Sequence, residues 1–127
     1  MDPISDMFIR IKNAQNAGHE SVRLPYSKFK YEIARALERG GLVAQVERKG
    51  KRVKKILDIG LIRHDGKPAI TNVELLSKPS RRLYSPYRKL RRASHGGMLI
   101  VSTPKGVLSE REAHKEKVGG EVLAELW

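Results

Sequence analysis

Residues 98–127 read M-L-I-V-S-T-P-K-G-V-L-S-E-R-E-A-H-K-E-K-V-G-G-E-V-L-A-E-L-W. The run Met98–Val101 is continuously apolar, which predicts a strand buried on both faces. Ser109 followed three residues later by Glu112 is a capping box, which predicts a short helix. We expect the pair Gly119–Gly120 to stop this helix and Glu121–Trp127 to form a final strand.

A compact polar segment, Ser102–Gly106, follows the apolar run, and we expect it to connect the buried strand to the capped helix. Hydroxyls such as those of Ser102 and Thr103 both donate to and accept from a base edge or a ribose 2′-OH. Lys105 suits a phosphate, and Gly106 lets the backbone turn or approach a partner closely. An ordinary connection has the same composition, so the residues alone leave both interpretations open. The segment lacks the glycine spacing of a nucleotide-hydrolysing phosphate loop.

The first half of the chain predicts a helix–strand–helix–hairpin arrangement. Asp2 and Pro3 suit the start of a helix that ends near Asn16, and a second helix is expected over 27–39. Strand-like runs follow at 42–46 and 53–62, with 48–51 as a hairpin turn. The next break is Asp65-Gly66 followed by Pro68, a turn signal at which we place a domain boundary.

Short strands are expected in the second half over 69–76, 83–85 and 97–102. The predicted class is therefore α+β, with two small α/β domains packed together. The expected domains are residues 1–64 and residues 65–127, the second mostly β with one short helix and carrying the polar loop.

The charge of the chain predicts an anionic partner. Its 127 residues hold 26 Lys and Arg against 14 Asp and Glu, a net charge of +12. Six bases lie in the eight residues 48–55, and no acid occurs between Glu74 and Glu110. Because Tyr84 and Tyr87 interrupt the second basic stretch, cations and stackable rings occur together, as in nucleic-acid-binding surfaces. Each cluster alone could be a solvated face, and basic residues on strands and loops do not suit a membrane surface.

Several function classes are disfavoured. The chain has no Cys, which excludes disulfides and Cys-based zinc sites. Its four His residues lack the spacing of a metal-binding helix, and no nucleophile motif is present. We therefore expect no enzyme, no metal, no cofactor and no small-molecule substrate. No run is long and apolar enough to span a membrane, and the acidic start is unlike a signal peptide, so we expect a cytoplasmic protein.

Three stretches carry a recognisable pattern: the opening D-P-I-S-D-M with R-I-K-N-A at 10–14, S-K-P-S-R-R-L-Y at 77–84, and above all Ser102–Leu123. Together they resemble the bacterial small-subunit ribosomal protein eight family. The resemblance implies binding to the central domain of small-subunit ribosomal RNA, which the protein organises during assembly. It also implies neighbouring small-subunit proteins, including protein five, as partners, and in some bacteria repression of the protein's own operon through its messenger RNA.

The resemblance also assigns RNA-binding residues. The loop gives Ser102, Thr103, Lys105 and Gly106, and Tyr84 and Glu121 belong to the same surface. Contacts to the RNA backbone are expected from Arg10, Asn13, Lys28 and Lys30 in the first half, and from Arg81, Arg91 and Arg92 in the second. The chain departs from the family at Pro104 and Ser80, where Ser and Gly are usual. The alternative function is an assembly scaffold that acts through protein contacts and binds RNA without specificity.

Overall fold

The computed structural model describes residues 2–127, which form two compact units. The first unit ends at Thr71, and the second is Asn72–Trp127. Each unit combines helix with antiparallel sheet, so the predicted α+β class is confirmed, and the second unit consists mostly of strands.

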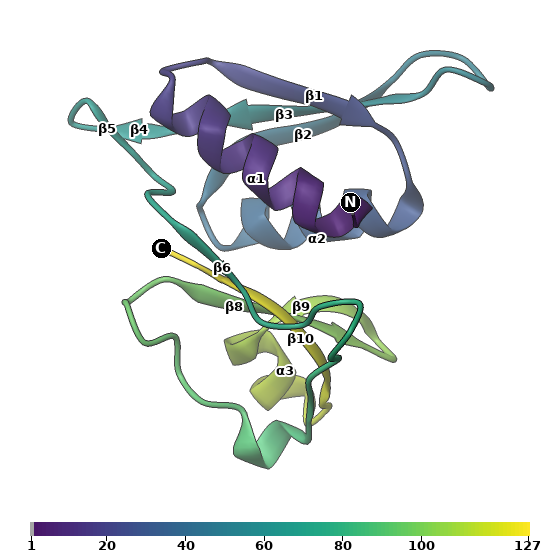
Figure 1. Cartoon of the computed structure of the whole chain (residues 1–127), viewed down its shortest axis with the longest axis vertical. Helices are drawn as coiled ribbons and strands as arrows, with labels where there is room; N and C mark the ends of the chain where they lie inside the picture. Colours follow the sequence, from purple (N-terminus) through teal and green to yellow (C-terminus); the bar gives the residue numbers. More distant parts are fainter. Residues whose placement is uncertain (1) are drawn as a thin grey trace. The chain divides into compact units, whose positions relative to one another are not determined.

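Two helices and three long strands build the first unit (Figure 1). In chain order they are α1 (Pro3–Asn16), β1 (Ser21–Pro25), α2 (Lys28–Arg39), β2 (Val43–Lys49) and β3 (Ile56–Leu61). Both helices begin at side-chain caps: Asp2 accepts the N–H of Ile4 at 3.3 Å, and Ser27 accepts the N–H of Lys30 at 3.1 Å. These caps satisfy N–H groups that have no partner within a helix. The helix–strand–helix–hairpin order of the first unit is as predicted.

The first sheet has the strand order β1-β3-β2, and every pairing is antiparallel. Alternate residues of the strands, such as Leu24 and the pair Leu57 and Ile59, are buried. Buried residues of the helices, including Phe8 and Leu37, complete the core on that face. The opposite face carries charged side chains, among them Arg23 and Asp58.

The loop between β2 and β3 is a protruding basic arm, residues 50–55, where part of a strand was predicted. Lys54 donates its N–H to the carbonyl of Lys51 at 2.9 Å, which closes a turn. Gly50 has φ +97°, and a Cβ there would lie 2.2 Å from the carbonyl oxygen of Lys54. The prediction that a strand starts at Val53 was wrong because this turn takes residues 51–54, and β3 begins at Ile56.

A two-stranded hairpin lies where the domain boundary was predicted. Strand β4 (Arg63–His64) pairs with β5 (Lys67–Pro68), and Asp65-Gly66 form their turn at φ +52° and +78°. Arg63 ties this hairpin to the end of α1, since its guanidinium donates to the carbonyl of Gln15 at 2.8 Å. The turn signal was correct, but the turn belongs to the first unit, and the division between the units follows Thr71.

The second unit is a sheet with one covering helix. Its elements are β6 (Val73–Leu75), β7 (Tyr84–Ser85), the 3-10 helix η1 (Tyr87–Lys89), β8 (Met98–Thr103), β9 (Gly106–Ser109), α3 (Glu110–Glu116) and β10 (Gly120–Leu126). The strand order is β6-β10-β8-β9, and β7 also pairs with β10. Ala113 of α3 packs on Val101 of β8, and residues 98–101 are all buried, as predicted.

Two local predictions for the second unit were wrong. A further strand, β9, stands between the polar loop and α3, so this loop is a hairpin turn and not a strand-to-helix connection. The helix starts with the predicted capping box at Ser109 but ends at Lys117, which takes the left-handed conformation at φ +57°. Gly119–Gly120 therefore do not end the helix.

Candidate nucleic-acid interface

The polar loop is a tight turn that uses the hydroxyl of Thr103 internally. Thr103 pairs with Gly106 across the β8–β9 hairpin, leaving Pro104 and Lys105 at the tip. The Thr103 hydroxyl donates to the carbonyl of Gly106 at 2.7 Å and accepts the N–H of Lys105 at 3.1 Å. Pro104 fixes its own φ near −65°, and Gly106 takes φ +113°. The departure at Pro104 is thus compatible with the hairpin.

Ser102 and Lys105 are left to face a partner. Within the described residues the Ser102 hydroxyl forms no hydrogen bond, and its side chain is half-buried beside the turn. Lys105 Nζ lies 3.4 Å from Glu116 Oε2, but both side chains are half exposed, so water screens this pair. A phosphate could replace Glu116 as the counter-charge of Lys105.

Three predicted residues form a row across the second sheet. Glu121 of β10 pairs with Tyr84 of β7 on one side and with Ser102 of β8 on the other. Directly opposite residues of antiparallel strands share one face, so these three side chains are neighbours. Tyr84 is 73% exposed, which leaves its ring available for stacking on an unpaired base.

The close approach of neighbouring strands explains why positions 119 and 120 are both glycine. A Cβ on Gly119 would lie 2.3 Å from the carbonyl oxygen of Ser85, and a Cβ on Gly120 would lie 1.9 Å from that of Ser102. The two glycines therefore let β7 and β8 approach the start of β10. This approach places Tyr84 and Ser102 beside Glu121.

An arginine that the predicted site lacked belongs to this row. Arg82 donates to Glu121 Oε2 at 3.3 Å and thereby orients the carboxylate. Its neighbour Arg81 is exposed, and the backbone groups of Arg81 and Lys78 bond each other at 2.9 Å, closing a turn. Two signals pointed to Arg82: its place in the acid-free stretch, and its place in the family-like stretch 77–84.

Arg91 and Arg92 are adjacent in the chain but have different surroundings. The Arg91 guanidinium donates to Glu125 Oε1 at 3.0 Å, and the Glu125 side chain is fully buried. His95 adds its N–H to Glu125 Oε2 at 3.2 Å. Burial alone would raise the pKa of Glu125, but the hydrogen bonds from Arg91 and His95 lower it below its usual range. Both arginines are exposed, but Arg91 is already paired with Glu125, whereas Arg92 has no such partner among the described residues.

The four candidates of the first unit lie on its helices. Arg10 and Asn13 are exposed on α1 at i, i+3 spacing, which places them on one face. Arg10 pairs with Asp6 at 3.0 Å on the surface. Lys28 and Lys30 stand in the first turn of α2 but are two residues apart, so they point in different directions.

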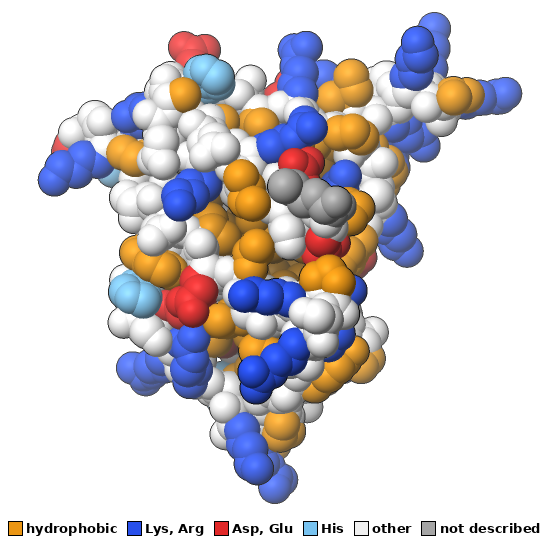
Figure 2. Space-filling model, viewed as in Figure 1, with side chains coloured by type: hydrophobic (Ala, Val, Ile, Leu, Met, Phe, Trp, Pro, Cys, Tyr) orange, Lys and Arg blue, Asp and Glu red, His pale blue; other side chains and the backbone are white. Residues whose placement is uncertain are grey.

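The basic arm is a further cationic surface of the first unit, and Figure 2 shows Lys and Arg side chains gathered along it. Arg48 and Lys55 at its base lie 5.5 and 5.7 Å from the ring centre of Tyr26. Lys49 Nζ lies 3.0 Å from Asp58 Oδ2, and this hydrogen bond raises the pKa of Lys49. The lysine of the tip, Lys51, has no acidic partner among the described residues.

Across residues 2–127 no group of three His, Asp or Glu side chains is arranged to hold a metal ion. None of the helices in that range is long and apolar enough to cross a membrane.

Fold, charge and surface together define a small, basic α+β protein with its exposed chemistry suited to a polyanion. The chain belongs to the ribosomal protein S8 family: the family model, described as Ribosomal protein S8, matches residues 2–127. This is a family of ribosomal structural proteins, which is not a class of enzymes.

Relatives of similar length support the assignment. The chain is 42% identical over 127 residues to a protein of Pelagibacter ubique and 43% identical over 127 residues to one of Erythrobacter litoralis. It is 42% identical over 130 residues to one of Synechococcus sp.. Each is named small ribosomal subunit protein uS8, and each comparison covers 99% of this chain and 97% of the relative.

Proposed function

We propose that this chain is a structural component of the cytoplasmic small ribosomal subunit and binds the central domain of its ribosomal RNA. The Tyr84–Glu121–Ser102 row and the adjoining β8–β9 turn make the surface that reads the RNA. The observation that carries this assignment is the register of β10, which joins side chains distant in sequence into one row beside Lys105.

The chemistry of the row suits irregular RNA. Unpaired bases expose edges and faces that a regular A-form helix hides. Tyr84 offers a stacking surface, and the free hydroxyl of Ser102 both donates and accepts. The Glu121 carboxylate, oriented by Arg82, accepts from base N–H groups or a 2′-OH. Exposed cations such as Lys28, Arg81 and Lys51 supply affinity through phosphates, without sequence preference.

The same surface serves the finer roles that the family suggests. Repression of the chain's own operon requires a messenger RNA site with the shape of the ribosomal one, competing for the same row. Neighbouring small-subunit proteins, with protein five among them, would contact surfaces that the RNA leaves uncovered.

A salt series tests the RNA assignment. We expect tight binding to a central-domain ribosomal RNA fragment and weak binding to an unrelated hairpin of equal length, with the ratio persisting as salt rises. Non-specific binding is electrostatic and declines steeply with salt. If both RNAs bind alike and dissociate together, the scaffold alternative holds, and specificity must come from protein neighbours.

A further inference from the structure

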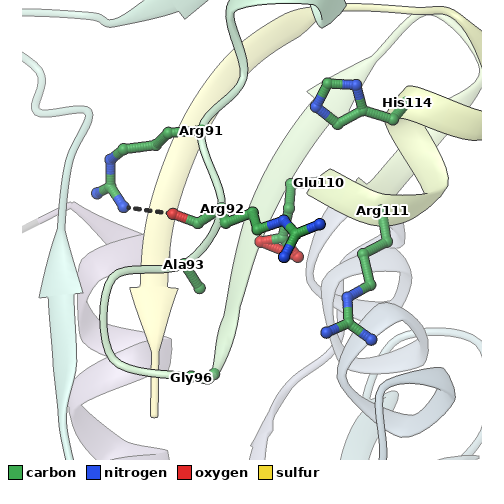
Figure 3. Close-up of a pocket in the computed structure, with 8 residues that line it drawn as sticks. Arg91, Arg92, Ala93, Gly96, Glu110, Arg111 and His114 are labelled. Carbon is green, nitrogen blue, oxygen red and sulfur yellow. Dashed lines mark hydrogen bonds between the residues drawn. The ribbon is translucent and has the colours of Figure 1, made fainter.

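The second unit contains a cavity of about 720 Å³ away from the Tyr84–Glu121–Ser102 row. One wall is the segment 91–97, and the other is α3, which contributes Glu110, Arg111 and His114 (Figure 3). The volume lies within the range of small-ligand sites, about 300–1,000 Å³. The cavity therefore has room for a ligand.

Two of its arginines are available to a ligand, and one is not. Arg91 is bound to Glu125, to Ser94 and to the backbone carbonyl of Arg92. The guanidinium groups of Arg92 and Arg111 form neither a hydrogen bond nor an ion pair among the described residues. Figure 3 shows Arg92 extending from its segment toward Glu110 and the α3 side of the cavity, where Arg111 lies.

The acidic group in the cavity is already occupied. Glu110 is 4% exposed, and its Oε2 accepts the N–H of Leu99 at 2.7 Å. Burial raises the pKa of Glu110, while the hydrogen bond from Leu99 and the charge of Arg111 act in the opposite direction. His114 is likewise held, because its Nε2 lies 2.9 Å from the carbonyl oxygen of Leu90. The cations of the cavity thus outnumber its acids, and its two free groups are guanidiniums.

Guanidinium groups favour phosphoryl oxygens, since their fixed donors match two oxygens at once. We propose that Arg92 and Arg111 form a clamp for a phosphoryl group, as a site separate from the RNA-reading row. The Arg91–Glu125 pair positions the neighbouring Arg92, because Arg91 bonds the Arg92 carbonyl at 3.1 Å. The phosphoryl group comes either from an RNA backbone or from a small phosphorylated molecule.

The test is a titration of the full chain with inorganic phosphate and with pyrophosphate, followed by ¹H–¹⁵N NMR. We expect saturable shifts confined to the backbone N–H groups of 92–97 and 110–114. Arg92→Gln and Arg111→Gln, which remove one exposed charge each, should each weaken binding about tenfold or more, as losing a charged hydrogen bond does. Arg88→Gln is the matched control, because Arg88 is exposed in the same basic stretch outside the cavity.

Shifts spread over the whole basic surface would overturn the clamp, and so would equal losses in all three variants. Two further arms identify the source of the phosphoryl group. If RNA occupies the clamp, pyrophosphate competes with the central-domain fragment, and Arg92→Gln flattens the salt slope. If a small molecule occupies it, RNA and pyrophosphate bind together. Ser102→Ala separates this proposal from the RNA assignment, since it should leave pyrophosphate binding unchanged.

Discussion

Arg91 and Glu125, separated by 34 positions in the chain, meet at 3.0 Å with the carboxylate fully buried and the guanidinium half exposed. Glu125 lies on β10, the strand to which β6, β7 and β8 all pair. The contact thus fastens the segment 91–97 to the middle of the second sheet.

Arg91→Ala should therefore reduce stability much more than Arg92→Ala. Removing Arg91 leaves a buried carboxylate with only His95 as partner, at a cost of about 1–3 kcal/mol. Arg92 is exposed and unpaired, so its removal should change stability by less than about 0.5 kcal/mol. Urea unfolding of the two variants measures the difference, and equal midpoints would contradict the role of Arg91.

Glu125 also predicts a pH dependence. The pKa of its carboxyl group is lowered on folding, so this group contributes stability above its unfolded pKa of about 4.3. The contribution is lost as the pH falls through the lower folded value. Glu125→Gln should lower stability at pH 7 and flatten the decline below about pH 4.3. Unfolding free energies from pH 3 to pH 7 test this, and parallel curves for both proteins would be inconsistent with it.

Ser102 and Thr103 should respond differently to removal of their hydroxyls. Ser102→Ala removes a free group and should cost about 1–3 kcal/mol with the central-domain fragment but nothing with a random RNA. Thr103→Ala opens the turn bonds to Gly106 and Lys105, so it should also broaden the NMR signals of residues 104–106. Identical behaviour of the two variants would show that the turn bonds are unimportant.

Lys51 of the basic arm and Lys49, the last residue of β2, should differ in their effect on the salt dependence. Lys51→Ala should weaken every RNA alike and reduce the salt slope by about 0.7–0.9, the value of one phosphate contact. Lys49→Ala should change the slope less, because Asp58 already pairs with this ammonium group. Slopes measured from 50 to 300 mM salt decide between equal and unequal roles.

Gly120→Ala should disrupt the sheet at the candidate site. Its Cβ would lie 1.9 Å from the carbonyl oxygen of Ser102, so β8 must move away from β10. We expect a loss of more than about 2 kcal/mol in stability, as overpacking produces. Gly41→Ala is a comparison for the opposite case, because its φ of +76° strains an alanine although the space around it is open. Full retention of stability by Gly120→Ala would show that crowding is not important there.

Local signals in the sequence predicted local structure correctly, and long-range pairing limited the rest. The caps at Asp2 and Ser109 and the burial of Met98–Val101 depend on neighbouring residues, and all were predicted. The hairpin at 103–106 was missed because β9 is only four residues long and runs directly into α3.

The candidate site shows the same limit. The resemblance supplied Tyr84, Glu121 and Ser102, but only the register of β10 shows that they are neighbours. Arg91 and Arg92 are alike in sequence, and they differ because a glutamate far along the chain binds one of them. Arg111 gave no signal of its own, since it stands among alternating charges on a short helix.

The position of β10 has a consequence for synthesis of the protein on a ribosome. Its first unit completes its strand pairs within residues 21–68, so it can fold while later residues are still being added. Strands β6, β7 and β8 of the second unit must wait for Gly120–Leu126, the strand that joins them. Until then β8, which contains Met98–Val101, can pair only with β9, and its other edge stays open, which is the kind of edge that promotes aggregation.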